Sequence, residues 1–161
     1  MKYFLVIIIA LVLLFGCTPK VNLEAEKTTV KENIDQIPQA IETEDMDTFS
    51  ALMAHDPDMV NFGTDAGERW VGWDAMKASM EQQFAAFEDS KVSIRNQVIK
   101  VRDSGQVAWF SEIMDWSTMT QGQQVDLKGI RLTGILEKQN DKWKFVQLHF
   151  SVGVSGQAAE Y

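Results

Sequence analysis

The sequence predicts an α+β domain in which three helices pack on a curved, mostly antiparallel sheet. After its apolar N-terminus, the first half of the chain holds three segments whose apolar residues recur at helical spacing. The second half holds a run of long segments rich in β-branched and aromatic residues, as strands are. Helices followed by consecutive long strands favour an α+β fold over a parallel sheet of alternating helices and strands.

Each predicted helix is recognised by an apolar stripe. The first stripe runs from Val30 to Ile41, and Pro38 should kink that helix because proline cannot donate a backbone hydrogen bond. Asp45 can cap a second, shorter helix. The third helix covers about 74–88. Its stripe consists of Trp73, Met76, Met80, Phe84 and Phe87.

The predicted strands differ in length. Two short ones, 59–62 and 69–71, flank a glycine-rich turn. Four longer strands follow, at about 91–102, 106–119, 124–138 and 142–153. In the first of these the apolar alternation changes phase, which predicts a β-bulge near 98–99 that would curl the sheet.

Two registers are open to the last hairpin. A two-residue turn at Asn140–Asp141 would pair residue 138 with 143, whereas a three-residue loop would pair 138 with 142 and place Arg131 opposite His149. Only the three-residue loop separates an apolar face from a mixed one, so we predict that register. The apolar face would hold Ile130, Leu132, Gly134, Leu136, Val146, Leu148, Phe150 and Val152. The mixed face would hold Arg131, Thr133, Ile135, Phe145, Gln147, His149 and Ser151.

The N-terminus has the pattern of a secretory signal. Lys2 precedes an uncharged, mostly apolar run from Tyr3 to Phe15, which is shorter than the ~20 residues of a transmembrane helix. The run ends Leu14-Phe15-Gly16-Cys17, which resembles the bacterial lipobox. That resemblance implies cleavage of residues 1–16 and a fatty-acylated, palmitate-type anchor on Cys17. We therefore expect a membrane lipoprotein of the cell envelope. An Asp directly after the cysteine is the signal that retains such lipoproteins in the inner membrane, and this chain has Thr18 there, so we expect the outer membrane if the cell has one.

Composition limits the partners. Loss of residues 1–16 removes Lys2 and no acidic residue, leaving 14 basic against 23 acidic residues, a net charge of −9. Nucleic acid is therefore not an expected partner. The single cysteine excludes a disulfide framework. We expect residues 17–27 to be the lipidated cysteine and a tether, 28–154 to be one domain, and 155–161 to be a loose tail.

Two stretches resemble the SnoaL-like branch of the nuclear transport factor 2-like superfamily, which includes ketosteroid isomerase. They are the glycine turn from Phe62 to Gly72 and the ending from Trp143 to Ser151. The resemblance implies a cone with a cavity between the helices and the concave sheet face, and frequent dimerisation through the convex face. The ending is also similar to the association domain of calmodulin-dependent kinases, whose pocket arginines match Gly134 and Phe150 here. Because both are apolar in this chain, an apolar ligand fits better than an anion.

We predict that an apolar small molecule binds between the third helix and the sheet. The pocket would be lined by Trp73, Met76, Met80, Phe84, Phe110, Glu112, Leu132, Gly134 and Phe150. Glu112 is the expected polar group, although the opposite face of its strand, with Trp109 and Asp115, could equally point inward. The mixed face offers a homodimer interface or an alternative site. Its candidate residues are Arg131, Gln147, His149 and Ser151.

Catalysis has weaker support in the sequence. The donor tyrosine of the ketosteroid isomerases has no counterpart, because the only tyrosines are Tyr3 and Tyr161. No two of the acid/base candidates are spaced so that they must share a site, so catalytic residues stay unassigned. The candidates are Asp65, Glu112, Asp115 and His149. No cofactor motif or metal-ligand spacing is visible. We expect a membrane-tethered, non-catalytic binding or assembly domain, with a small acid/base enzyme of the isomerase or cyclase type as the alternative.

Overall fold

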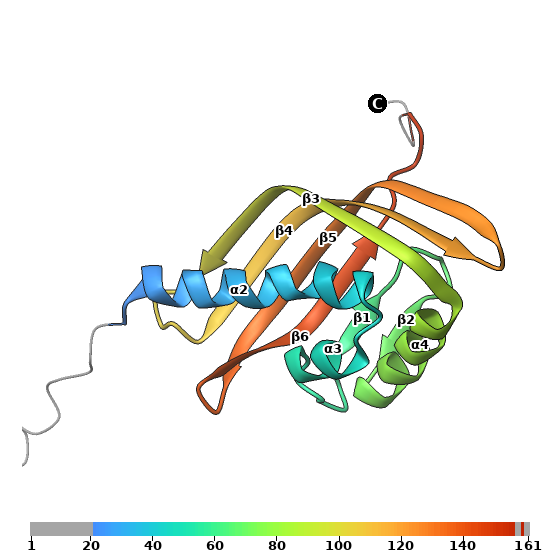
Figure 1. The fold of residues 1–161 in the computed structure, drawn as a ribbon. Coiled ribbons are helices and arrows are strands. Elements are labelled where there is room, and N and C mark those ends of the chain that lie inside the picture. The colour runs from blue at the N-terminus through green and yellow to red at the C-terminus, as the bar shows by residue number, and fades with distance from the viewer. Residues whose placement is uncertain (1–20, 157–158, 160–161) are drawn as a thin grey trace, which may run out of the picture.

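Three helices lie against one face of a curved six-stranded sheet (Figure 1). The structure is a computed structural model that describes residues 21–156 and 159. The helices are α2 (Leu23–Glu42), α3 (Met46–Leu52) and α4 (Trp73–Ala86). The predicted signal peptide and Cys17 lie outside the described residues. Within the described residues, no helix is long and apolar enough to cross a bilayer.

The sheet is mostly antiparallel, as predicted. Its strands are β1 (Val60–Phe62), β2 (Arg69–Val71), β3 (Phe87–Val101), β4 (Val107–Thr120), β5 (Gln123–Gln139) and β6 (Lys142–Ser151). They are arranged in the order β2-β1-β6-β5-β4-β3, and only the β1–β6 pair is parallel. The α+β fold with three helices on a curved sheet is therefore confirmed.

Helix α2 begins earlier than the sequence predicts. Its apolar stripe is buried, from Val30 to Ile41. The side chain of Asn22 caps the helix by accepting the N–H of Ala25 at 3.2 Å. One turn further, the Glu26 carboxylate accepts hydrogen bonds from Lys138 and from the Trp143 indole. The predicted tether of residues 17–27 is therefore too long, because residues from Leu23 onward belong to the folded domain.

Bulges in the long strands curve the sheet. The bulge predicted near 98–99 lies slightly earlier, where Asn96 and Gln97 stand opposite Glu112, and a second irregularity follows Glu88. In β5 the register against β4 shifts beside Gly129, which has a φ of +70° and donates its N–H to Asp115 at 2.7 Å. An extra residue bends its strand and increases the twist, so the far ends of β4 and β5 curl over the helices (Figure 1).

The predicted register of the last hairpin is wrong. Asn140 and Asp141 form a two-residue turn with φ values of 49° and 62°, and Lys138 pairs with Trp143. Positive φ at both positions matches the twist of the flanking strands. A further shift between Ile135 and Leu136 leaves one extra residue in β6.

The shift in β6 changes which side chains face the core. Beyond it, Arg131 pairs with Ser151 rather than with His149, and His149 pairs with Thr133. The apolar and mixed faces keep most of their predicted members, except that Phe145 faces the core with no exposed surface while Val146 is only half-buried. Alternation alone could not reveal this exchange, because a bulge breaks it.

Candidate functional site

A cavity of about 330 Å³ lies between α4, the β1–β2 loop and the far ends of β4 and β5. Its wall is largely apolar. The main apolar contributors are Met76, Met80, Phe84, Met114, Trp116 and Phe150. The volume is within the range of small-molecule sites, which are usually apolar concavities with a few polar groups.

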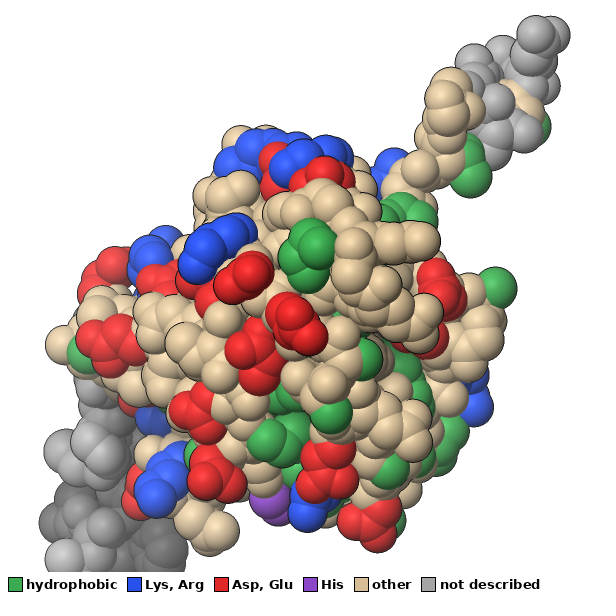
Figure 2. Space-filling model, turned by 45° about the vertical axis from the view of Figure 1, so that its right-hand side comes forward, with side chains coloured by type: hydrophobic (Ala, Val, Ile, Leu, Met, Phe, Trp, Pro, Cys, Tyr) green, Lys and Arg blue, Asp and Glu red, His purple; other side chains and the backbone are tan. Residues whose placement is uncertain are grey.

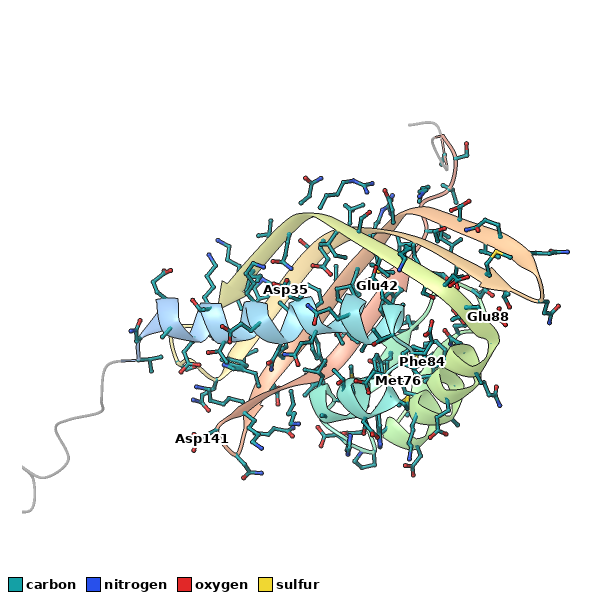
Figure 3. All side chains as sticks on the ribbon, in the orientation of Figure 1. Asp35, Glu42, Met76, Phe84, Glu88 and Asp141 are labelled. Carbon is teal, nitrogen blue, oxygen red and sulfur yellow. The ribbon has the colours of Figure 1, made fainter. Side chains whose placement is uncertain are left out.

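Four of the nine predicted pocket residues line this cavity, namely Met76, Met80, Phe84 and Phe150. Figure 3 shows Met76 and Phe84 extending from α4 toward the sheet. Successive turns of α4 place the stripe on one side of the helix, and burial of that stripe orients the helix.

The other five predicted pocket residues lie elsewhere. Trp73 stacks on His55 at the start of α4, with ring centroids 4.3 Å apart. Phe110 packs edge-on against Phe145 in the core, and Leu132 is fully buried there. These three side chains are buried in the core and do not line the cavity.

Gly134 has a different role from the one predicted. We expected its missing side chain to leave room in the pocket. A Cβ at this position would lie 2.5 Å from the Phe110 ring and 2.9 Å from the backbone oxygen of Gln147. Glycine is therefore needed for close packing, and the space beside it is already filled.

Glu112 faces inward but is separate from the cavity. Its side chain is 2% exposed, and its Oε2 accepts a hydrogen bond from Gln97 at 2.9 Å. The same Gln97 amide donates to Asp35 on α2 at 3.1 Å. Burial raises the pKa of Glu112; the bond from Gln97 opposes this effect, and the nearby charge of Asp35 adds to it. Glu112 Oε1 has no hydrogen-bond partner among the described residues.

The residues of β4 and β5 that line the cavity are not the ones predicted on those strands. Met114, Trp116 and Thr118 line the cavity from β4, and they continue the parity of Glu112, so alternation could have found them. On β5 the parity changes at Gly129, so that Leu127 joins Ile130 in the lining. A bulge with little sequence signal hides that second contribution.

Among the described residues that line the cavity, ionisable groups come only from the β1–β2 loop, whose exposure to solvent marks it as the entrance. These groups are Asp65 and Glu68, and Asp65 is exposed. Glu68 Oε2 accepts the backbone N–H of Asp65 at 3.0 Å. Deeper in the cavity, the buried Thr118 hydroxyl pairs with Ser90 at 3.0 Å. The hydroxyl of Thr118 thus has a hydrogen-bond partner within the protein, and the charged lining residues come from the β1–β2 loop.

The convex face of the sheet carries the other predicted residues. Arg131 and His149 are exposed, whereas Gln147 and Ser151 are half-buried. His149 also lies beside Phe62, with ring centroids 5.4 Å apart. Two large apolar side chains are exposed near this row: Val98 at 52% and Trp109 at 46%. Throughout residues 21–156, no group of three His, Cys, Asp or Glu side chains is placed to hold a metal ion.

Comparison with known proteins gives one family and one fold. The family model described as "SnoaL-like domain" matches residues 30–155. A comparison with curated proteins finds no match.

Solved structures of the same fold cover most of the chain. A nuclear transport factor 2-like superfamily protein from Salmonella enterica superposes with a TM-score of 0.75 at 17% identity, over 86% of this chain and 98% of that one. A proposed dehydratase of the NTF2-like family from Streptomyces avermitilis superposes with a TM-score of 0.72 at 16% identity, over 82% of this chain and 99% of that one. A proposed calcium/calmodulin-dependent protein kinase II association domain from Xanthomonas campestris superposes with a TM-score of 0.66 at 22% identity, over 84% of this chain and 95% of that one.

Proposed function

Because this chain belongs to the SnoaL-like family, we propose that its cone is a binding domain for a small, largely apolar molecule. Lipid on Cys17 would tether the domain to a membrane of the cell envelope. The tether would be short, since only Thr18–Val21 separate that cysteine from the helix cap Asn22. Four residues span at most about 14 Å.

The observation that carries this proposal is the character of the cavity. Its wall is built from methionine, aromatic and aliphatic side chains, and its charged groups lie at the entrance. Flexible methionines such as Met76, Met80 and Met114 adapt to irregular ligands. Removing apolar ligand surface from water would supply most of the affinity, at about 25 cal/mol per Å².

The alternative, a small acid/base enzyme, would need a carboxylate and a proton donor that both face the ligand. Glu112 has the environment of a proton-holding group, but its carboxylate bonds Gln97 beneath α2 and does not line the cavity. Asp65 lines the mouth but is exposed to water. The arrangement therefore favours binding over turnover.

Binding can be measured with a neutral hydrophobic dye such as N-phenyl-1-naphthylamine. The domain can be used as residues 21–161, because the solved relatives from Salmonella and Streptomyces are covered over 98% and 99% of their lengths by this fold. We expect saturable fluorescence enhancement. Leu127→Trp should abolish it, because the half-buried Leu127 lines the cavity and an indole there would fill it.

The matched control is Val71→Trp, which adds the same indole at a site that is 48% exposed and outside the cavity. This variant should bind the dye like the unmodified domain. Equal dye binding by Leu127→Trp, with the fold intact by circular dichroism, would contradict the proposed site. Turnover of an enolisable ketone that is lost in Glu112→Gln would support the enzyme instead.

A further inference from the structure

The charge at the mouth of the cavity restricts the ligand beyond its apolar character. Asp65 and Glu68 bring negative charge to the entrance, and no Lys, Arg or His among the described residues lines the cavity. The chain as a whole has a net charge of −8. Figure 2 shows acidic side chains around exposed apolar side chains on one face of the molecule. An anionic head group would find no counter-ion in this lining, whereas a cationic one would.

A glycine brings an acidic and an aromatic group together at this entrance. A Cβ on Gly63 would lie 2.1 Å from Glu68 Oε2 and 2.7 Å from the outer edge of the Trp70 ring. The carboxylate and the indole therefore occupy the space that a side chain at position 63 would take. Both groups line the cavity. Any larger residue at position 63 would push at least one of them away.

Further aromatic rings lie in the same wall. Phe87 and Trp116 meet edge-to-face with centroids 4.7 Å apart, and Phe84 and Phe150 also line the cavity. The face of an aromatic ring attracts cations, with tryptophan the strongest, and protein sites for quaternary ammonium groups combine such rings. An acidic side chain beside a tryptophan thus matches a cation that has little capacity for hydrogen bonding.

We propose that the cavity selects amphiphiles with a cationic head, of the quaternary ammonium or protonated amine class. The head would lie at the entrance beside Glu68 and Trp70, and the apolar body would lie against Met76, Met80 and Met114. This inference rests on the proposed binding function and adds the sign of the ligand's charge to it.

The test compares three ligands that share a ten-carbon chain: decyltrimethylammonium, decanol and decyl sulfate. Each ligand is titrated into the domain of residues 21–161 at concentrations below its critical micelle concentration. Binding is measured by calorimetry or by displacement of the neutral dye. We expect the ammonium compound to bind most tightly and the sulfate most weakly. Glu68→Gln should weaken binding of the ammonium compound roughly two- to fivefold, the size of an exposed charge pair, and should leave binding of decanol unchanged. The amide of glutamine can still accept the Asp65 N–H, so the loop should keep its fold.

The matched control is Glu24→Gln, which removes one negative charge from the first turn of α2, outside the cavity. It should leave the affinities for all three ligands unchanged. If decyl sulfate binds as tightly as the ammonium compound, or Glu68→Gln weakens decanol equally, the charge preference is overturned and the apolar site remains. If neither the dye nor any of the three ligands binds, the proposed function and this inference both fail.

Discussion

Glu112 shows how a single buried carboxylate can be structural rather than catalytic. It lies on the inward face of β4 opposite the bulge at Asn96 and Gln97, and Gln97 bridges it to Asp35 on α2. The bulge supplies the glutamine that satisfies one of its oxygens. Burial raises the pKa of Glu112, so the folded domain favours its protonated form.

The pH dependence of stability follows from that shift. In the unfolded chain Glu112 returns to its ordinary pKa of 4.5, below its folded pKa. Its contribution to stability is therefore fully present below about pH 4.5 and is lost as the pH rises through the folded pKa. We expect Glu112→Gln, which keeps an oxygen for Gln97, to raise the urea midpoint at pH 8 and to change it less at pH 4.5.

The control for this experiment is Glu137→Gln, which removes an exposed carboxylate from the neighbouring strand β5. Its urea midpoint should differ from the parent by the same amount at both pH values. A loss of stability in Glu112→Gln that is equal at pH 4.5 and pH 8 would show that the carboxylate is needed for packing and that its ionisation does not matter.

At the scale of elements, the bulges decide which side chains face the core and the cavity. In β6 the extra residue turns Phe145 inward and leaves Val146 half-buried. In β5 the register shift beside Gly129 brings the side chain of Leu127 into the cavity lining. The far ends of β4 and β5 therefore form a wall of the cavity because the sheet is bent there.

The bulge in β6 predicts unequal effects of two adjacent truncations. Phe145→Ala should reduce the free energy of unfolding by about 3–5 kcal/mol, as for other buried aromatic residues. Val146→Ala should cost about 1 kcal/mol, because its side chain is only half-buried. Urea denaturation of both variants measures the difference. If Val146→Ala lost more free energy of unfolding than Phe145→Ala, Val146 would lie in the core, as the register with a three-residue hairpin loop requires.

At the scale of the whole molecule, we propose that the convex sheet face joins two copies of the chain. Trp109 is 46% exposed there, and it stands beside Ile135 on the next strand. Gln147 and His149 follow across β6 and offer polar groups for a contact that is repeated by symmetry.

We expect residues 21–161 to sediment as a dimer at about 100 μM, well above a micromolar dissociation constant. Trp109→Glu should give a monomer, because two copies of the new charge would be buried without partners. Val71→Glu is the control, since Val71 has a similar exposure of 48% and lies on β2. A dimer that persists in Trp109→Glu would place the interface elsewhere, and a parent that is monomeric would refute it.

Membrane attachment is also a property of the whole chain. We expect the full-length protein to be processed before Cys17 and to carry lipid there, because its thiol is the only nucleophile of its kind in the sequence. In bacteria, Cys17→Ser should accumulate as an uncleaved precursor of higher mass on a denaturing gel. Thr18→Ser, next to the cysteine, should be processed normally. Cleavage and lipid labelling that persist in Cys17→Ser would contradict the assignment.

The sequence by itself determined the α+β class, the order of the helices and strands, and the buried stripes of α2 and α4. These follow from local periodicity, since a helix or strand must turn its apolar face toward the core. The stripe of α4 placed Met76, Met80 and Phe84 beside the cavity for the same reason.

Only the tertiary structure decided the hairpin register, the inward face of β4 and most of the cavity wall. The hairpin register and the part of the wall from β5 depend on bulges in β5 and β6, each of which shifts every later side chain by one position with little signal in the residues that form it. The inward face of β4 was settled by packing, because both of its faces carry apolar residues. The pairing of Glu68 with Trp70 across Gly63 likewise required the fold of the β1–β2 loop, because no periodic pattern relates these three positions.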